Sequence, residues 1–171
     1  EAIREIALDT SSRTSVALIK VLCRHHFRIA PAFVPHGPDL AEMTRRHDAG
    51  LLIGDPAFDV DHEALGLRKI DLGEEWSRLT GLPFVFAVFA ARPGVITPEL
   101  VAELTRAAQV GLGLRTELAQ EFARERGGDP ERYRRYLTRR MRYAVGPYEQ
   151  SAMERFFALA AEQGLLPPTT L

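Results

Sequence analysis

Short apolar runs alternate with amphipathic stretches up to about residue 92, and this alternation restricts the fold more than any other feature. Parallel strands need a crossover connection, so strands that alternate with helices favour βαβ units and a mainly parallel sheet. Apolar runs of strand length predict strands at 6–9, 32–35, 49–53, 67–72 and 84–90, the last of them fully buried. The helices predicted among them span 12–27, 39–47 and 74–79.

The second half of the chain contains only helical patterns. Thr97 before Pro98 and Asp129 before Pro130 each combine a capping side chain with a proline at the first helical position. The predicted helices span 98–126, 129–143 and 148–163. We therefore predict an α/β lobe with the binding loops at 1–92 and a helical tail at 93–171. We expect this tail to cover a sheet supplied by further sequence upstream.

A turn rich in hydroxyl groups joins the first predicted strand to the first predicted helix. The first N–H groups of a helix have no internal partner and carry the positive end of its dipole, so this turn suits a carboxylate or a phosphate. A simple N-cap with surplus hydroxyls explains the same residues. The candidate binding residues are Thr10, Ser11, Ser12, Thr14 and Ser15.

A second turn, Gly54-Asp55-Pro56, follows the third predicted strand. Ligands of open α/β sheets bind beyond the carboxyl ends of the strands, and parallel strands bring these two turns to the same edge. We expect Asp55 to accept hydrogen bonds from the first turn or to face the ligand. A plain tight turn is the alternative interpretation of the same residues.

Composition and motifs narrow the classes of partner. The net charge of −1 gives no electrostatic basis for binding nucleic acid or an anionic membrane, and no apolar run approaches the ~20 residues of a membrane helix. The single cysteine, Cys23, excludes a zinc site with several cysteines and lies where a buried structural thiol is expected. No nucleotide or redox motif is present. We expect a small-molecule substrate and no cofactor.

Two clusters have competing interpretations. The acidic loop 59–63, with His62, offers oxygen and nitrogen ligands, but adjacent loop residues rarely converge on one ion and the EF-hand spacing is absent, so we expect no metal. The arginine cluster Arg124 to Arg142, interleaved with tyrosines, resembles nucleic-acid binding surfaces. The near-neutral chain instead favours a solvated helix face with the tyrosines packed inward.

Four segments together resemble a known family. The segments are LDTSSRTS at 8–15, LLIGDPA at 51–57, DLGEEW at 71–76 and TGLPFVFA at 80–87. Their order and spacing are similar to the chorismate dehydratases of the bacterial futalosine route to menaquinone. The first and last segments are specific, whereas the Gly-Asp-Pro turn alone is not. The resemblance extends into the helical tail.

This resemblance implies a fold like that of type II periplasmic binding proteins, with two lobes around a cleft and a three-layer αβα lobe in this chain. It implies dehydration of chorismate to 3-[(1-carboxyvinyl)oxy]benzoate in the cytoplasm, without a metal or redox cofactor. The five hydroxyl residues would orient the substrate, Asp55 would shape the cleft, and 84–86 would belong to a strand beside the hinge. A homodimer is also expected.

The chain departs from the family in one respect. Family members carry roughly a hundred further residues upstream. These include an asparagine to which catalysis is assigned, whereas this chain has no asparagine. We therefore expect the catalytic residues to lie upstream and residues 1–171 alone to be inactive. Two alternatives stay open, namely a solute-binding or sensor domain of the same fold and the sister 1,4-dihydroxy-6-naphthoate synthase.

Overall fold

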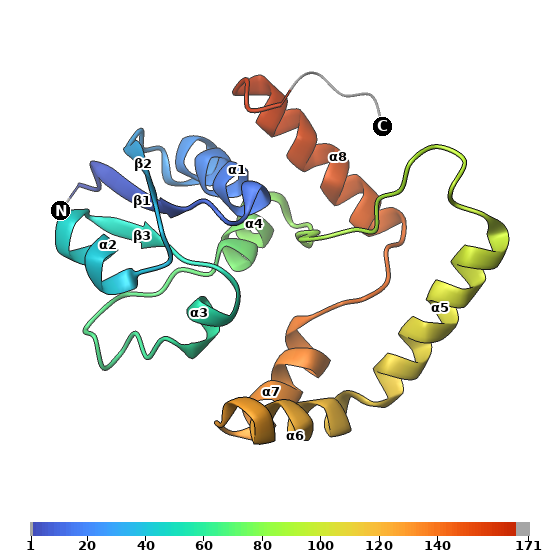
Figure 1. Ribbon diagram of the computed structural model, residues 1–171. Coiled ribbons are helices and arrows are strands. Elements are labelled where there is room, and N and C mark those ends of the chain that lie inside the picture. The colour runs from blue at the N-terminus through green and yellow to red at the C-terminus, as the bar shows by residue number, and fades with distance from the viewer. Residues whose placement is uncertain (1, 167–171) are drawn as a thin grey trace. The chain divides into compact units, whose positions relative to one another are not determined.

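The computed structural model describes residues 2–166 and divides the chain into two compact units (Figure 1). One unit, called the sheet unit here, combines the residues up to 87 with those from 146 onward. It contains β1 (Glu5–Asp9), α1 (Arg13–Leu22), the π-helix η1 (Cys23–Phe27), β2 (Ala32–His36), α2 (Leu40–Arg46), β3 (Ala49–Leu51), α3 (Gly54–Asp59), α4 (Leu72–Thr80) and α8 (Pro147–Glu162). The helical unit, 88–145, contains α5 (Pro98–Gly113), α6 (Arg115–Arg126), α7 (Pro130–Arg135) and the π-helix η2 (Tyr136–Arg140).

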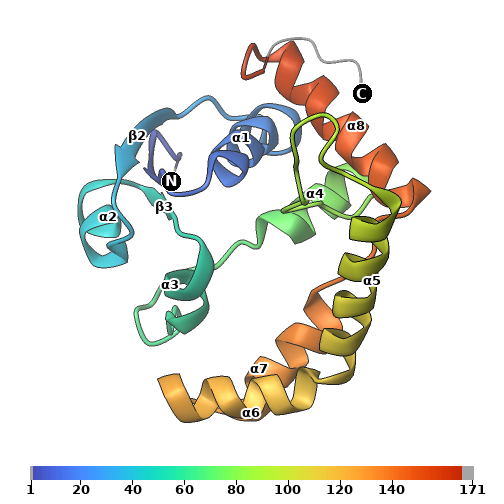
Figure 2. The same ribbon diagram turned by 45° about the vertical axis from the view of Figure 1, so that its right-hand side comes forward.

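A small parallel sheet organises the sheet unit and confirms the predicted α/β class. Its strand order is β2-β1-β3, with β1 in the centre. Side chains alternate across a strand, so Ile6 and Leu8 share one face, where they pack with Ile19 of α1. Gly50 of β3 lies against Met43 of α2, and a Cβ on Gly50 would come within 3.0 Å of the Met43 sulfur. The helices α1 and α2 therefore cover opposite faces of the sheet (Figure 2).

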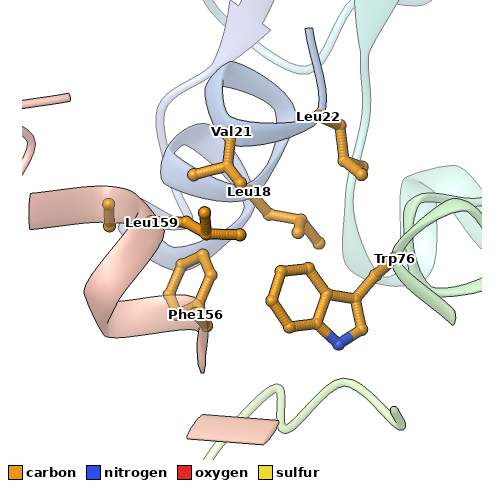
Figure 3. Close-up of a cluster of buried hydrophobic side chains, with 7 residues drawn as sticks. Leu18, Val21, Leu22, Trp76, Phe156 and Leu159 are labelled. Atoms are coloured by element: carbon orange, nitrogen blue, oxygen red, sulfur yellow. The ribbon is translucent and has the colours of Figure 1, made fainter. Parts of the chain in front are cut away.

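A second hydrophobic cluster joins three helices of the sheet unit (Figure 3). Trp76 of α4 is fully buried at its centre and makes edge contacts with Phe84 and Phe156, at centroid distances of 5.6 and 5.9 Å. The indole N–H donates a hydrogen bond to the carbonyl of Pro83 at 3.0 Å, so the one polar group of this side chain is satisfied. The remaining buried members are Leu18, Val21 and Leu22 of α1 and Leu159 and Ala160 of α8.

Two predicted strands are wrong. In 67–72, the carboxylate of Asp71 accepts hydrogen bonds from the N–H groups of Gly73 and Glu74 and thereby caps α4, so the apolar Leu72 begins a helix. The run 84–90 pairs with no strand among the residues that the structure describes. Phe84 packs beside Trp76, but Phe89 is 89% exposed, so the run is not fully buried.

Two of the predicted helices begin at their expected caps, and three of the predicted helices are interrupted. Thr97 and Asp129 cap α5 and α7 through their side chains, as predicted. The predicted helix 98–126 breaks at Leu114, whose N–H bonds to the carbonyls of both Val110 and Gly111, an arrangement that tightens the last turn. The predicted helices 12–27 and 129–143 each pass into a π-helix, η1 and η2.

The helical unit buries little apolar surface by itself. Every residue of α5 from Val101 to Val110 is exposed, and Ala119 is the buried residue of α6. Side chains of α6 and α7 pack against each other. The rings of Phe122 and Tyr133 make an edge contact there, with their centroids 4.8 Å apart. The Tyr133 hydroxyl donates to the carbonyl of Gly127 at 2.9 Å and fixes the turn between these helices.

Candidate functional site

The turn after β1 is held by a buried carboxylate. Asp9 ends the central strand and is only 2% exposed, and its Oδ1 accepts a hydrogen bond from the N–H of Ser11 at 3.0 Å. This bond between an aspartate and the amide two residues later is an Asx turn. It directs the chain from the rigid end of the strand toward the start of α1.

Ser12 is the N-cap of α1. Its Oγ accepts the N–H of Ser15 at 3.1 Å, and its hydroxyl donates to the Ser15 Oγ, also at 3.1 Å. The Ser12 hydroxyl is therefore engaged within the helix start, so of the five predicted binding hydroxyls this one has an established structural task. The first turn of α1 contains no acidic residue, which leaves the positive end of the helix dipole without an opposing charge of its own.

Three hydroxyls of the turn remain available. Thr10 and Ser11 are exposed, and Thr14 is half-buried. Within residues 2–166, the side-chain hydroxyls of these three residues make no hydrogen bond. Hydroxyl donors beside free helix N–H groups are the groups that bind a carboxylate well. The local geometry thus combines one capping serine with several unused donors.

The second predicted turn lies at the same edge of the sheet. Because β3 pairs parallel to β1, Asp55 follows the carboxyl end of a strand next to the one that leads into the hydroxyl turn. Gly54 has a φ of 64°, a left-handed conformation that favours glycine, and Asp55 is exposed in the first turn of the short helix α3. The structure brings the two turns to one edge as predicted, while the role of Asp55 in binding stays a prediction.

The sequence alone did not show that His36 lies beside Asp9 at the carboxyl edge of the sheet. The parallel register pairs Asp9 of β1 with His36 of β2, so both residues end adjacent strands. The imidazole Nδ1 donates to the carbonyl of Gly37 at 2.8 Å. The sequence contains a histidine at a strand end, but only the register of the sheet reveals that it lies beside Asp9.

His26 and Cys23 each have a structural role. His26 Nε2 lies 2.8 Å from Glu75 Oε2, and the same buried carboxylate also pairs with Arg78, so this cluster ties η1 to α4. Cys23 is buried as predicted, and burial raises the pKa of its thiol to about 11. Within the described part of the chain, no three histidine, cysteine or acidic side chains gather as metal ligands.

The arginine cluster lies on α6, α7 and η2, with Arg142 just after η2. Arg134 pairs with Glu131 at 2.6 Å, and the Arg126 guanidinium lies 5.4 Å from the centre of the Phe122 ring. The expectation that the tyrosines all pack inward is wrong, because Tyr136 and Tyr143 are exposed. Across residues 2–166, no helix is long and apolar enough to cross a membrane.

An open α/β sheet with a hydroxyl-rich helix start at its carboxyl edge is an arrangement that suits the binding of small organic anions. Residues 1–162 match the family model described as menaquinone biosynthesis, and the chain belongs to this family. It is similar to the chorismate dehydratase of Thermus thermophilus, with 36% identity over 148 residues. The match covers 77% of this chain and 54% of that relative, so the chain spans about half of the relative's length. The resemblance seen in the sequence is thereby confirmed.

Proposed function

We propose that this protein dehydrates chorismate to 3-[(1-carboxyvinyl)oxy]benzoate in menaquinone biosynthesis. The observation that carries the proposal is the 36% identity to a chorismate dehydratase over most of this chain. The hydroxyl turn supports it, because chorismate is a dicarboxylate and the turn offers donors suited to a carboxylate. Since the chain matches about half of that relative, the activity is assigned to the protein with all residues that its gene encodes.

The hydroxyl turn has a definite task in this reaction. The backbone N–H groups of Arg13 and Thr14 open α1 without partners inside the helix, and the hydroxyls of Thr10, Ser11 and Thr14 lie in the same turn. Together they would hold one substrate carboxylate and orient the ring. Loss of a ring proton and of the ring hydroxyl as water yields an arene, so aromatisation drives the step and positioning is the protein's main contribution.

The complete protein is proposed to adopt the two-lobe fold of type II periplasmic binding proteins. The parallel sheet with helices on both faces supports this assignment for one lobe. The division into lobes at 1–92 and 93–171, the part of Asp55 in shaping the cleft, the homodimer and the cytoplasmic location stay predictions. The same holds for the expected absence of a cofactor and of a nucleic-acid partner.

The binding assignment is tested by removing two of the unused hydroxyls. We expect the double substitution Ser11→Ala with Thr14→Ala to raise the KM for chorismate at least about tenfold. A hydrogen bond to a charged group is worth about 1.5–3 kcal/mol, and about 1.4 kcal/mol corresponds to tenfold, so even one lost bond suffices. The matched control is Thr105→Ala with Ser151→Ala, which removes two exposed hydroxyls that bond to the carbonyls of their own helices.

The activity itself is assayed by mass spectrometry on the protein as its gene encodes it, with chorismate and no added metal or nucleotide. The expected product is lighter than chorismate by one water. Binding without turnover would contradict the dehydratase proposal and favour a sensor or solute-binding protein. An unchanged KM in the Ser11/Thr14 variant, equal to that of the control, would contradict the carboxylate assignment while leaving the reaction in place.

A further inference from the structure

Asp9 combines almost complete burial with a charge. Its exposed fraction is 2%, and it is one of two charged residues among the buried polar side chains that the structure describes. The other, Glu75, is paired with His26 and Arg78, whereas no cationic side chain among residues 2–166 pairs with Asp9. Burying a carboxylate is costly unless its oxygens are hydrogen-bonded, so such a residue needs a specific reason.

The hydrogen bonding of the Asp9 carboxylate is confined to the hydroxyl turn. Its Oδ1 accepts the N–H of Ser11, and its Oδ2 has no hydrogen-bond partner among the described residues. The single observed task of the carboxylate is therefore to shape the backbone between the end of β1 and the cap of α1.

This task determines where the binding hydroxyls lie. The sheet fixes the chain at Asp9, and Ser12 fixes it again through its bonds to Ser15. Between these two points only Thr10 and Ser11 intervene, and the Asp9 bond reaches the backbone of the second of them. Without that bond the two residues gain rotational freedom, and their hydroxyls lose the preorganisation that binding requires.

We propose that Asp9 is a positioning residue, whose buried carboxylate holds the turn at Thr10 and Ser11 so that their hydroxyls are aligned to bind a carboxylate of the substrate. This inference rests on the proposed function. Direct contact is disfavoured, because an aspartate carboxylate against a substrate carboxylate would repel it. The acceptor oxygen of Asp9 is therefore the feature that matters, and asparagine supplies the same acceptor without the charge.

The test compares Asp9→Asn, which keeps the acceptor, with Asp9→Ala, which removes it. The matched control is Asp39→Ala, because Asp39 also accepts a backbone N–H at 3.0 Å, that of Glu42, but does so as the cap of α2 and makes no bond to the hydroxyl turn. In the protein as encoded by its gene, kcat, KM and the Kd for chorismate are measured together with thermal unfolding. We expect Asp9→Ala to raise KM and Kd at least about tenfold with a smaller change in kcat, because preorganised binding is lost.

Asp9→Asn is expected to stay within about threefold of the unaltered protein, and Asp39→Ala is expected to leave KM and Kd unchanged. Equal impairment in Asp9→Asn and Asp9→Ala would overturn the inference, and so would a KM and Kd for Asp9→Ala equal to those of Asp39→Ala. If Asp9→Ala does not fold, Asp9→Ser replaces it, since serine forms the same turn more weakly. Its KM and Kd must then exceed those of Asp9→Asn at least about threefold, and equal values would refute the role.

Measuring the Kd for chorismate, in addition to turnover, allows the role of Asp9 to be tested separately from the proposed function. Unaltered protein that binds chorismate without turnover contradicts the dehydratase proposal, yet the order of the Kd values among the Asp9 variants still decides the role of Asp9. Unaltered protein that neither binds nor converts chorismate overturns both proposals.

Discussion

Leu18 lies at the centre of the Trp76 cluster, and its truncation to alanine should destabilise the sheet unit severely. Leu18 is fully buried against side chains of α1, α4 and α8. Leu18→Ala removes three buried carbon atoms, which at about 0.8 kcal/mol each is about 2.4 kcal/mol of transfer free energy. The cavity left behind adds to this, so we expect the free energy of unfolding to fall by about 2.5–4 kcal/mol.

The chain contains a suitable probe for this experiment. Trp76 is its single tryptophan and belongs to the same cluster, so its fluorescence during urea unfolding reports on the sheet unit. The control is Leu65→Ala, which removes the same atoms from an exposed position of the same unit and should change stability by less than about 0.5 kcal/mol. Far-UV circular dichroism is recorded in the same urea series. Unfolding is two-state if the circular dichroism and fluorescence transitions coincide. A Leu18→Ala effect no larger than that of the control would refute the packing argument.

Three further predictions concern single residues of the sheet unit. Ser12→Ala should lower the free energy of unfolding by about 1 kcal/mol, whereas Ser12→Asp should retain the cap, as measured by urea unfolding. The Cys23 thiol, with its pKa raised to about 11 by burial, should react with iodoacetamide at about pH 8 only after unfolding, and a rate equal to that of free cysteine would contradict this. Hydrogen bonds from the N–H groups of Arg4 and Glu5 lower the pKa of Asp48. Its stabilising contribution is therefore complete above its unfolded pKa and lost as the pH falls through the folded pKa, so Asp48→Asn should weaken the dependence of the urea midpoint on pH between about 6 and 3.

Features whose cause is local were predictable from the sequence. Thr97 and Asp129 each cap the helix that the sequence assigned to them, because a capping bond joins residues only two or three positions apart. The parallel pairing of β1 with its neighbours followed from the alternation of strands and helices. The starts of α5 and α7 and the position of the hydroxyl turn between β1 and α1 were therefore predicted correctly.

Features that depend on distant partners were not predictable in the same way. The apolar run 84–90 has the composition of a buried strand, but a strand also needs a neighbour to receive its hydrogen bonds, and periodicity contains no information about that neighbour. The break at Leu114 follows two glycines that weaken the helix, a signal that the long helical pattern obscured.

The candidate site shows the same distinction. Its hydroxyls were recognised, because they are consecutive in the sequence and precede a helical pattern. The position of Asp9 beside His36 arises from the sheet register, and its near-complete burial depends on the folded unit as a whole, so no local pattern indicated them. The separate task of Ser12 as a cap likewise required the geometry of its two bonds.

The core around Trp76 closes only when α8 is present, because Phe156 and Leu159 complete it after the whole helical unit has intervened in the chain. During synthesis the ribosome must add 83 residues between Trp76 and Leu159, the difference between their positions in the chain. At about 5–20 residues per second this takes on the order of 4–17 s. Phe156 and Leu159 do not cover the apolar faces of α1 and α4 during that interval, so the nascent chain should need chaperone protection until α8 emerges.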